Sequence, residues 1–294
     1  MPELPEVETT VRGLAGLLEG EVIAHVQVNR PDLRRPFPVN LAEVLTGASV
    51  TRLGRRAKYG LIYLAPQPEP KPEPEPEPEL EPATQRAPMI EPVLIFHLGM
   101  SGRWRIDPDA IGKHDHLVLE TRAGHVLALN DARRFGSVDL VEAARLDSFA
   151  PFAAMGPEPL GQALTAAGLK RALAGRSAPI KMMLLDQRIV AGLGNIYVCE
   201  ALHRARIRPD RPAGAVSLAK LRLLVPAIRD VLEASIAAGG SSMRDYALPD
   251  GELGYFAAQW QAYGREGEAC ACGGTVERFT QGGRSTFWCP RCQR

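Results

Sequence analysis

The residues best suited to chemistry stand at the start of the chain, which reads Met-Pro-Glu-Leu-Pro-Glu. Removal of the initiator methionine would leave Pro2 as a free secondary amine, which loses its proton near neutral pH, whereas a lysine keeps its proton to about pH 10. Such an amine can attack a carbonyl-like carbon and form a charged iminium. Glu3 could serve as the paired acid or base, and Glu6 could orient the pair. The alternative is a disordered start with a proline in the first helical turn and Glu6 as a simple helix-terminal acid.

Clustered cysteines near the end of the chain are the second group that could do chemistry. They form two pairs, Cys270 with Cys272 and Cys289 with Cys292. The pairs flank a short stretch with Gly282-Gly283 at its expected turn, a pattern typical of a zinc ribbon with four thiolate ligands. Disulfides are the alternative, and a reducing cytoplasm disfavours them. The remaining Cys199 stands within an expected helix and reads as a small buried residue.

Length and composition limit the class of protein. A chain of 294 residues, 45% of them hydrophobic, predicts two domains and a small appendage. No apolar run approaches the length of a membrane span, and the N-terminus lacks the pattern of a signal peptide, so we expect a cytoplasmic protein without a membrane partner. The net charge of +1 hides an asymmetry, because residues 66–92 carry −5 and the rest of the chain therefore +6. A modestly basic body is compatible with nucleic-acid binding.

Residues 66–92 are rich in Pro-Glu repeats. They contain too few apolar groups to offset the entropy of ordering, so we expect an extended, disordered surface loop. A tolerated surface loop explains the segment better than a specific partner motif. If the basic body binds nucleic acid, the one expected effect of this acidic loop is a weak repulsion of DNA.

The remaining pattern predicts a multi-domain α+β protein. Residues 3–19 show the apolar spacing of an amphipathic helix, and Gly20 suits its C-terminal cap. Short, β-branched runs then predict an all-β sandwich or barrel with strands at 22–28, 61–64, 93–96, 116–120, 126–129 and 138–141. Helices are expected at 162–174, 179–186, 195–204 and 218–238, with a kink or break at Pro226 and a capping box at 242–245 that opens another short helix. We therefore expect domains at 1–150, 151–264 and 265–294.

Several motifs occur in a fixed order along the chain. They are Pro2-Glu-Leu-Pro-Glu-Val-Glu-Thr9, Lys58-Tyr-Gly60 after two arginines, His97-Leu-Gly-Met100-Ser-Gly102, Asp131-Ala-Arg133-Arg-Phe135-Gly136, Gly192-Leu-Gly-Asn195-Ile-Tyr197 and the cysteine segment. Together they closely resemble the formamidopyrimidine-DNA glycosylases, bacterial enzymes that excise oxidised purines. The resemblance spans nearly the whole chain except residues 66–92.

The resemblance implies a fold with three parts: an N-terminal β-sandwich with a flanking helix, a helix–two-turn–helix domain, and a zinc ribbon with one structural Zn²⁺. The ribbon would present a hairpin and not take part in catalysis through its metal. One departure concerns the first cysteine pair. The family has two residues between these cysteines, whereas here only Ala271 intervenes, which narrows the bite of the two thiolates.

The resemblance also assigns roles to residues. Pro2 would be the nucleophile, Glu3 the acid, Lys58 an aid to β-elimination at the phosphate beside the lesion, and Arg284 the group for the final elimination. His97, His114, Arg176 and Asn195 would bind the DNA backbone. Met100, Arg133 and Phe135 would fill the gap left by a flipped base, with Arg133 reading the orphaned cytosine.

Taken without the family, the same residues have simpler interpretations. Lys58 after Arg55-Arg56 could belong to a solvated basic face. Core packing could account for Met100 and Phe135. The glycines before Asn195 could merely connect two helices.

The implied function is a bifunctional glycosylase and AP lyase that acts on double-stranded DNA with oxidised bases or abasic sites. Its substrates would be chiefly 8-oxoguanine paired with cytosine, and formamidopyrimidines, with strand cleavage by β,δ-elimination through an N-terminal proline iminium. The protein would be a monomer, associated with the bacterial nucleoid through DNA, without a redox cofactor or a catalytic metal. Two alternatives stay open. One is an endonuclease VIII-type enzyme for oxidised pyrimidines, which the segments 4–9 and 134–136 resemble less well; the other is a non-catalytic DNA-binding protein.

Overall fold

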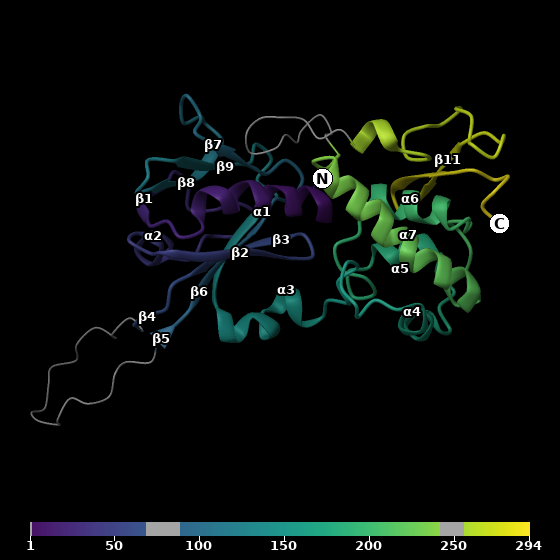
Figure 1. Cartoon of the computed structure of the whole chain (residues 1–294), viewed down its shortest axis with the longest axis horizontal. Coiled ribbons are helices and arrows are strands. Elements are labelled where there is room, and N and C mark those ends of the chain that lie inside the picture. Colours follow the sequence, from purple (N-terminus) through teal and green to yellow (C-terminus); the bar gives the residue numbers. More distant parts are fainter. Residues whose placement is uncertain (1, 69–88, 242–255) are drawn as a thin grey trace, which may run out of the picture.

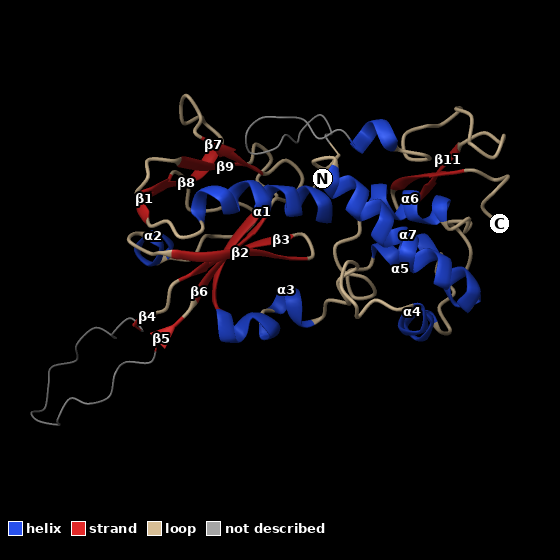
Figure 2. Ribbon diagram, viewed as in Figure 1, coloured by secondary structure: helices blue, strands red, loops and turns tan. Residues whose placement is uncertain are grey.

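The computed structural model describes residues 2–68, 89–241 and 256–294. Figure 1 shows two halves: a β-rich N-terminal half, and a helical half that ends in a small two-stranded sheet. In Figure 2 the strands of the first half form two layers, and helix α1 runs along them toward the helical half. The predicted α+β class, with a sandwich, a flanking helix, a helical part and a ribbon, is confirmed.

Helix α1 (Leu4–Leu18) joins the two halves. Its apolar stripe is buried as the spacing predicts, and Gly20 (φ +84°) follows its C-terminal end. Leu4 belongs to the core of the helical half, whereas the stripe from Val7 to Leu18 belongs to the core of the sandwich. The first turn of α1 is therefore held where the two cores meet.

The sandwich consists of two four-stranded antiparallel sheets. The first has the order β1 (Ile23–Val28), β8 (Asp115–Thr121), β9 (Val126–Asn130), β7 (Arg103–Ile106). The second has the order β10 (Ser137–Glu142), β6 (Pro92–His97), β3 (Tyr59–Leu64), β2 (Val50–Arg56). All the expected strands are present. The pattern missed β2 and β7, which are sheet edges rich in arginine and so lack an apolar run. A short helix, α2 (Leu41–Leu45), follows β1.

The prediction of disorder throughout 66–92 is wrong at the two ends of that segment. Strand β4 (Gln67–Pro68) pairs with β5 (Met89–Ile90), and β6 begins directly afterwards. The physical reason is that β3 and β6 pair antiparallel, which brings the two ends of the insertion side by side. Residues 69–88 lie outside the described part of the chain.

The short segments η1 (Ala143–Ser148) and α3 (Ala150–Ala153) pack on the face of β3 and β6 that is turned away from the sandwich core. The helical half contains the segments α4 (Ala166–Leu173), α5 (Ile180–Leu185), α6 (Asn195–Arg204), η2 (Ala213–Ala215), α7 (Leu218–Ala237) and η3 (Phe256–Gln259). Helix α4 starts later than expected, because Thr165 caps it by accepting a hydrogen bond from the Gly168 N–H. Helix α7 continues through Pro226, so no break occurs there, and buried residues on both sides of the proline hold it against α4 and α6. The expected capping box at 242–245 lies outside the described residues. No described helix is long and apolar enough to cross a membrane.

The C-terminal ribbon pairs β11 (Glu277–Gln281) with β12 (Arg284–Trp288). Gly282 and Gly283 form the turn at φ +56° and +73°, a conformation that favours glycine, as the sequence predicts. A Cβ on Gly282 would lie 2.4 Å from Met182 Cε, so this glycine also lets the turn approach α5.

Candidate active site between the two halves

Glu3 stands at the start of α1 and is buried against the loop before α6. Its Oε1 accepts a hydrogen bond from the Ile196 N–H at 3.2 Å. A Cβ on Gly194 would lie 2.1 Å from Glu3 Cδ, so only glycine permits this approach. A Cβ on Gly192 (φ +81°) would lie 2.6 Å from Leu4 Cδ1. The Leu4 N–H donates to the Gly192 carbonyl at 3.3 Å. The first motif of the sequence is thus packed onto the fifth.

Burial raises the pKa of Glu3 to about 7, against the lowering influence of Lys58. The second carboxyl oxygen, Oε2, is buried and has no hydrogen-bond partner among the described residues. A carboxyl group in this state is partly protonated at neutral pH and can donate a proton to a bound molecule. Pro2 is buried directly beside it in the chain.

Glu6 connects the start of α1 to the helical half. Its Oε2 accepts from the Glu3 N–H at 2.8 Å. Its Oε1 accepts from the Tyr197 hydroxyl at 2.5 Å and from the Ser241 N–H at 2.8 Å. The Tyr197 oxygen also lies 2.7 Å from Ser235 Oγ on α7. A simple helix-terminal acid would not need these buried partners, so the geometry favours the orienting role of Glu6.

Lys58 lies in the turn between β2 and β3 and is buried, which excludes a solvated basic face. Burial lowers its pKa, Glu3 raises it, and Arg284 lowers it further. Lys58, His97 and Arg284 line a cavity of about 310 Å³ together with groups of the helical half such as Gln187. The two halves therefore bring three nitrogen-bearing side chains to one cavity.

His97 is a neutral donor in this cavity. Burial, together with Lys58 and nearby arginines, lowers its pKa to about 4. Its Nδ1 lies 3.0 Å from the Gly99 nitrogen and accepts that N–H, which assigns the ring proton to Nε2. The ring therefore offers an N–H at neutral pH without adding a charge.

The hairpin that carries Arg284 is held from behind. Asn195 Nδ2 donates to the Ser285 carbonyl at 2.9 Å. Lys181 Nζ donates to the same carbonyl at 3.1 Å and to Thr286 Oγ1 at 2.8 Å. Burial lowers the pKa of Lys181. The sequence analysis did not identify Lys181 as a site residue, although a single lysine in the otherwise apolar helix Ile180–Leu185 was a visible signal. Arg284 itself stays exposed.

Met100, Arg133 and Phe135 are exposed on two neighbouring loops, so core packing does not explain them. The Arg133 guanidinium lies 4.9 Å from the centre of the Phe135 ring. A Cβ on Gly99 would lie 2.3 Å from the Phe135 carbonyl carbon, so this glycine lets the two loops touch. The structure brings the expected trio together.

Asp131 braces residues 98–102 and 131–136, which we name the reading loops after the role that the resemblance predicts for them. Its buried carboxylate accepts from Ser101 Oγ at 2.6 Å and from the Gly136 N–H at 2.8 Å. The Asp131 N–H donates to the carbonyl of half-buried His114 at 3.0 Å, so His114 lies beside the loops. Arg176 is exposed after α4, where its backbone bonds with Leu173 and Gly214.

The four cysteines of the ribbon fit one zinc ion. Their sulfurs lie within 4.8 Å of one another, with 4.0 Å between Cys270 and Cys292 and 3.5 Å between Cys272 and Cys289. Tetrahedral zinc with Zn–S bonds of about 2.3 Å requires sulfurs about 3.8 Å apart, far beyond disulfide distance. The shortened first pair does not prevent the cluster.

Helix α6 has two contacts that the sequence reasoning missed, one to the ribbon and one to the segment just before it. His203 Nε2 lies 3.3 Å from Cys270 Sγ, as a neighbour of the ligand set. Buried Glu200 accepts the N–H groups of Gln261, Ala262 and Tyr263 at 2.8–2.9 Å. Cys199 beside it is buried as predicted, and burial raises its pKa to about 11, which makes it an unreactive thiol.

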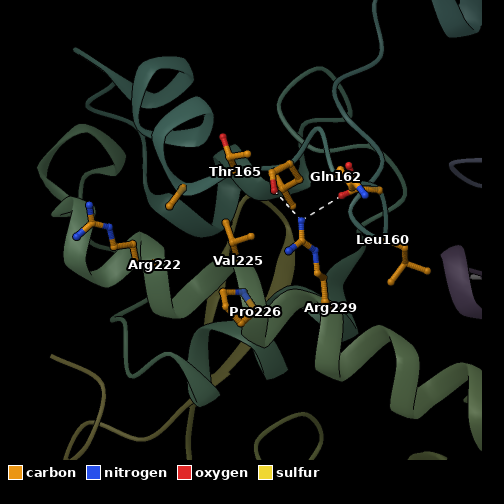
Figure 3. A pocket seen from close by; sticks show the side chains of 10 residues that line it. Leu160, Gln162, Thr165, Arg222, Val225, Pro226 and Arg229 are labelled. Carbon is orange, nitrogen blue, oxygen red and sulfur yellow. Dashed lines mark hydrogen bonds between the residues drawn. The ribbon is translucent and has the colours of Figure 1, made fainter.

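A separate pocket of about 590 Å³ lies between α4 and α7 (Figure 3). The described residues that line it include none of those expected to do chemistry. Its Arg229 instead holds nearby backbone carbonyls.

Three family models match consecutive parts of the chain. They are the formamidopyrimidine-DNA glycosylase N-terminal domain at residues 1–138, the H2TH domain of the same enzymes at 155–247, and a zinc finger found in these enzymes and in IleRS at 271–294. A formamidopyrimidine-DNA glycosylase of Novosphingobium aromaticivorans is 66% identical, and one of Zymomonas mobilis 48%, each over the whole length of both chains.

Solved structures agree with these matches. A complex of a Lactococcus lactis enzyme of this name with DNA containing Fapy-dG has a TM-score of 0.84 at 31% identity over all of both chains. The MutM (FPG) protein of Thermus thermophilus has a TM-score of 0.81 at 36% identity over 99% of this chain and 98% of its own. The chain therefore belongs to the formamidopyrimidine-DNA glycosylase family.

Proposed function

We propose that this protein removes oxidised purines from double-stranded DNA and cleaves the strand at the resulting abasic site. Its substrates would be 8-oxoguanine opposite cytosine and formamidopyrimidines. The observation that carries the proposal is the buried Glu3 carboxyl, with its pKa near 7 and one unpartnered oxygen. It follows Pro2 in the chain and interacts with the charge of Lys58, which lines the cationic cavity. Similar structures hold DNA with Fapy-dG or with an abasic site, which supports this class of substrate.

The reaction begins with extrusion of the damaged nucleotide, because its C1′ is out of reach inside the duplex. The Pro2 nitrogen attacks C1′, the C1′–base bond breaks, and the base leaves with the proton that the amine loses. Glu3 gives its proton to the sugar ring oxygen, the C1′–O4′ bond breaks, and the opened sugar stays bound to Pro2 as an iminium. The resulting iminium makes the C2′ proton acidic. Loss of that proton expels the 3′ phosphate, and a second elimination expels the 5′ phosphate. Water then hydrolyses the iminium and frees Pro2, so the products are a free base, an unsaturated sugar remnant and a one-nucleotide gap.

The cavity cations would handle the phosphates in these steps. Lys58 and Arg284 carry positive charge, and neutral His97 offers an N–H, so each can hold a phosphate oxygen near the reacting sugar. Arg284 would assist the last elimination. Asn195, His114 and Arg176 would contact the backbone further along.

The exposed trio would replace the flipped base in the stack. The Met100 thioether and the Phe135 ring are apolar and would fill the gap in the stack. The guanidinium N–H groups of Arg133 can donate to the orphaned cytosine. We further propose that the units 1–150, 151–264 and 265–294 act as one monomer. In it the zinc ribbon, held together by the four thiolates, presents Arg284 to DNA.

Borohydride trapping on a duplex with one 8-oxoguanine opposite cytosine tests this proposal. We expect a covalent adduct at residue 2, and no adduct when an uncleaved N-terminal tag blocks the amine. The matched control is the same preparation after removal of the tag. Trapping by the blocked protein would refute the role of Pro2, and faster excision from a duplex with an oxidised pyrimidine would favour the endonuclease VIII-type alternative.

A further inference from the structure

The turn that carries Lys58 has an unusual backbone. Ala57, between β2 and β3, adopts φ +53°, the left-handed region that residues with a Cβ rarely occupy. Such a conformation persists where surrounding contacts hold it in place. Because Lys58 follows directly, the contacts of Ala57 determine where the lysine amine points.

Glu158 supplies those contacts. Its Oε1 accepts from the Ala57 N–H at 2.6 Å and from Arg56 Nη1 at 2.8 Å. Its Oε2 accepts from Arg55 Nη1 at 2.9 Å, and that nitrogen also donates to the Ala57 carbonyl at 2.8 Å. Both peptide groups of Ala57 are thereby tied to one carboxylate, directly or through Arg55.

Glu158 belongs to the helical half and is itself anchored there. The Gly156 N–H donates to the Gln187 carbonyl at 2.9 Å, and the Ala191 N–H donates to the Pro157 carbonyl at 3.1 Å. The loop at 187–191 leads directly to Gly192 and Gly194, which contact the first residues of α1.

The segment after Glu158 is fixed as well. Arg229 on α7 donates to the carbonyls of Pro159 at 3.2 Å, Gly161 at 3.1 Å and Leu164 at 2.8 Å. Figure 3 shows its side chain directed into that segment. Glu158 is therefore held on both sides by the half of the molecule that carries Asn195.

An ordinary ion pair between the halves would not need this arrangement. Exposed ion pairs contribute little to stability. The side chain of Arg55, in contrast, is only 9% exposed, and it also pairs with Glu8 on α1 at 2.8 Å. The hydrogen bond from the Ala57 N–H to Glu158 holds the left-handed backbone conformation of Ala57. Attraction between opposite charges alone would not fix this conformation.

We propose that Glu158 is a positioning residue that sets the place of Lys58 relative to Glu3 and Asn195. It locks the left-handed turn on one half of the molecule to the loop of the other half, so that lysine and acid meet on the same nucleotide. This inference rests on the proposed function, because it gives Lys58 a role at the DNA phosphate.

Single-turnover cleavage of a duplex with a preformed abasic site tests the inference. In Glu158→Gln one carboxylate oxygen becomes an NH₂ group that faces arginine N–H donors, so the turn loses a contact. Because small misplacement of a reacting group slows catalysis strongly, we expect a rate about 10- to 100-fold lower. The dissociation constant for a duplex with a tetrahydrofuran abasic analogue should change less than about threefold. Glu142→Gln, the same change in an exposed pair with Arg145, is the control and should keep its rate within a factor of about two.

A double variant separates positioning from general support of the fold. Glycine adopts the left-handed conformation without help, so adding Ala57→Gly to Glu158→Gln should recover at least about a third of the lost rate. Recovery of this size together with the single-variant loss supports the proposal. A Glu158→Gln rate within a factor of two of wild type, or no recovery in the double variant, would overturn it.

Labelling of lysines with an amine-selective reagent, read by mass spectrometry, gives a result independent of catalysis. We expect Lys58 to react at least about threefold faster in Glu158→Gln, relative to exposed Lys113 in the same chain, because its burial depends on the turn. An unchanged ratio would overturn the proposal. Wild-type protein without any abasic-site cleavage would instead refute the proposed function, while the labelling ratio would still report on Glu158.

Discussion

The catalytic end of the molecule, by which we mean the surroundings of Glu3 and Lys58, is shielded from solvent, whereas the reading loops are exposed to it. Glu3 and Lys58 are 3% and 9% exposed, whereas Met100 and Phe135 are 37% and 43% exposed. Burial is the largest cause of both pKa shifts at the catalytic end. Under the proposed function, the acid that would protonate the sugar and the lysine that would hold a phosphate are thus already buried in the protein alone, while the side chains that would replace a flipped base are exposed.

The two regions also differ in what holds them. Glu3 depends on a contact with Ile196, far away in the sequence, and leaves one carboxyl oxygen without a partner. The reading loops are braced by Asp131, whose two oxygens both have nearby partners. The catalytic end therefore costs more folding free energy than the reading loops, and it is more sensitive to small shifts of its side chains.

The largest effect is expected from Glu3→Gln. The amide cannot donate a proton to the sugar ring, so base excision from an 8-oxoguanine duplex should fall by about 10²- to 10⁴-fold. Cleavage at a preformed abasic site should stay within about tenfold, since that step starts without the base. Single-turnover assays on both duplexes measure the difference, and an equal loss of both activities would show that Glu3 has another role.

Gly194→Ala tests how tightly the catalytic end is packed. The new Cβ would meet the Glu3 carboxyl at 2.1 Å, so the acid must move, and excision should fall by about 100-fold. The control is Gly16→Ala on α1, where a Cβ meets nothing within 4 Å. Rates of the two variants under single-turnover conditions make the comparison, and near-wild-type excision by Gly194→Ala would contradict the packed geometry.

Arg133→Ala tests the exposed region. A bidentate contact to a base contributes about 1–3 kcal/mol to discrimination, so the preference for cytosine over adenine opposite 8-oxoguanine should shrink by about tenfold or more. The melting temperature should not change, because the side chain is exposed. Arg122→Ala, in the exposed turn between β8 and β9, is the matched control; an unaltered preference in Arg133→Ala would assign the reading of cytosine elsewhere.

The last prediction concerns stability and pH. The pKa of Glu3 rises from 4.5 to about 7 on folding, so its ionisation costs no stability below pH 4.5, destabilises the fold increasingly between pH 4.5 and about 7, and has its full effect above that range. Glu3→Gln should therefore be more stable than wild type by up to about 3 kcal/mol at pH 8 and by much less at pH 5. Exposed Phe135→Ala should stay within about 0.5 kcal/mol at both pH values. Thermal unfolding measures both, and a constant gain across pH would rule out titration of Glu3 as its source.

Much of the fold follows from local sequence. Helix α6 begins and ends where predicted, the stripe on α1 is buried, and the turn at Gly282-Gly283 and the cysteine cluster form as expected. These features depend on periodicity, turn chemistry and ligand spacing, which neighbouring residues set. The edge strands β2 and β7 escaped prediction because arginines interrupt their apolar pattern.

The supporting residues of the site could not be predicted in the same way. Glu158, Lys181 and Glu200 are ordinary charged residues in the sequence, and no spacing relates them to their partners. Their contacts span 101, 105 and 62 residues respectively, for the Ala57 N–H, Thr286 and the Ala262 N–H. Only tertiary packing shows that Lys181 and Glu200 are buried and that all three charges have partners.

The sequence by itself determined which chemical groups this protein has: an amine that proline can offer, an acid beside it, four thiolates and a set of cations in ordered motifs. Tertiary structure alone decided the state of those groups. The pKa values of Glu3, His97 and Lys58 depend on burial and on charged partners distant in the chain. The reason is that desolvation and charge interactions act through space, whereas a sequence pattern reports only what lies along the chain.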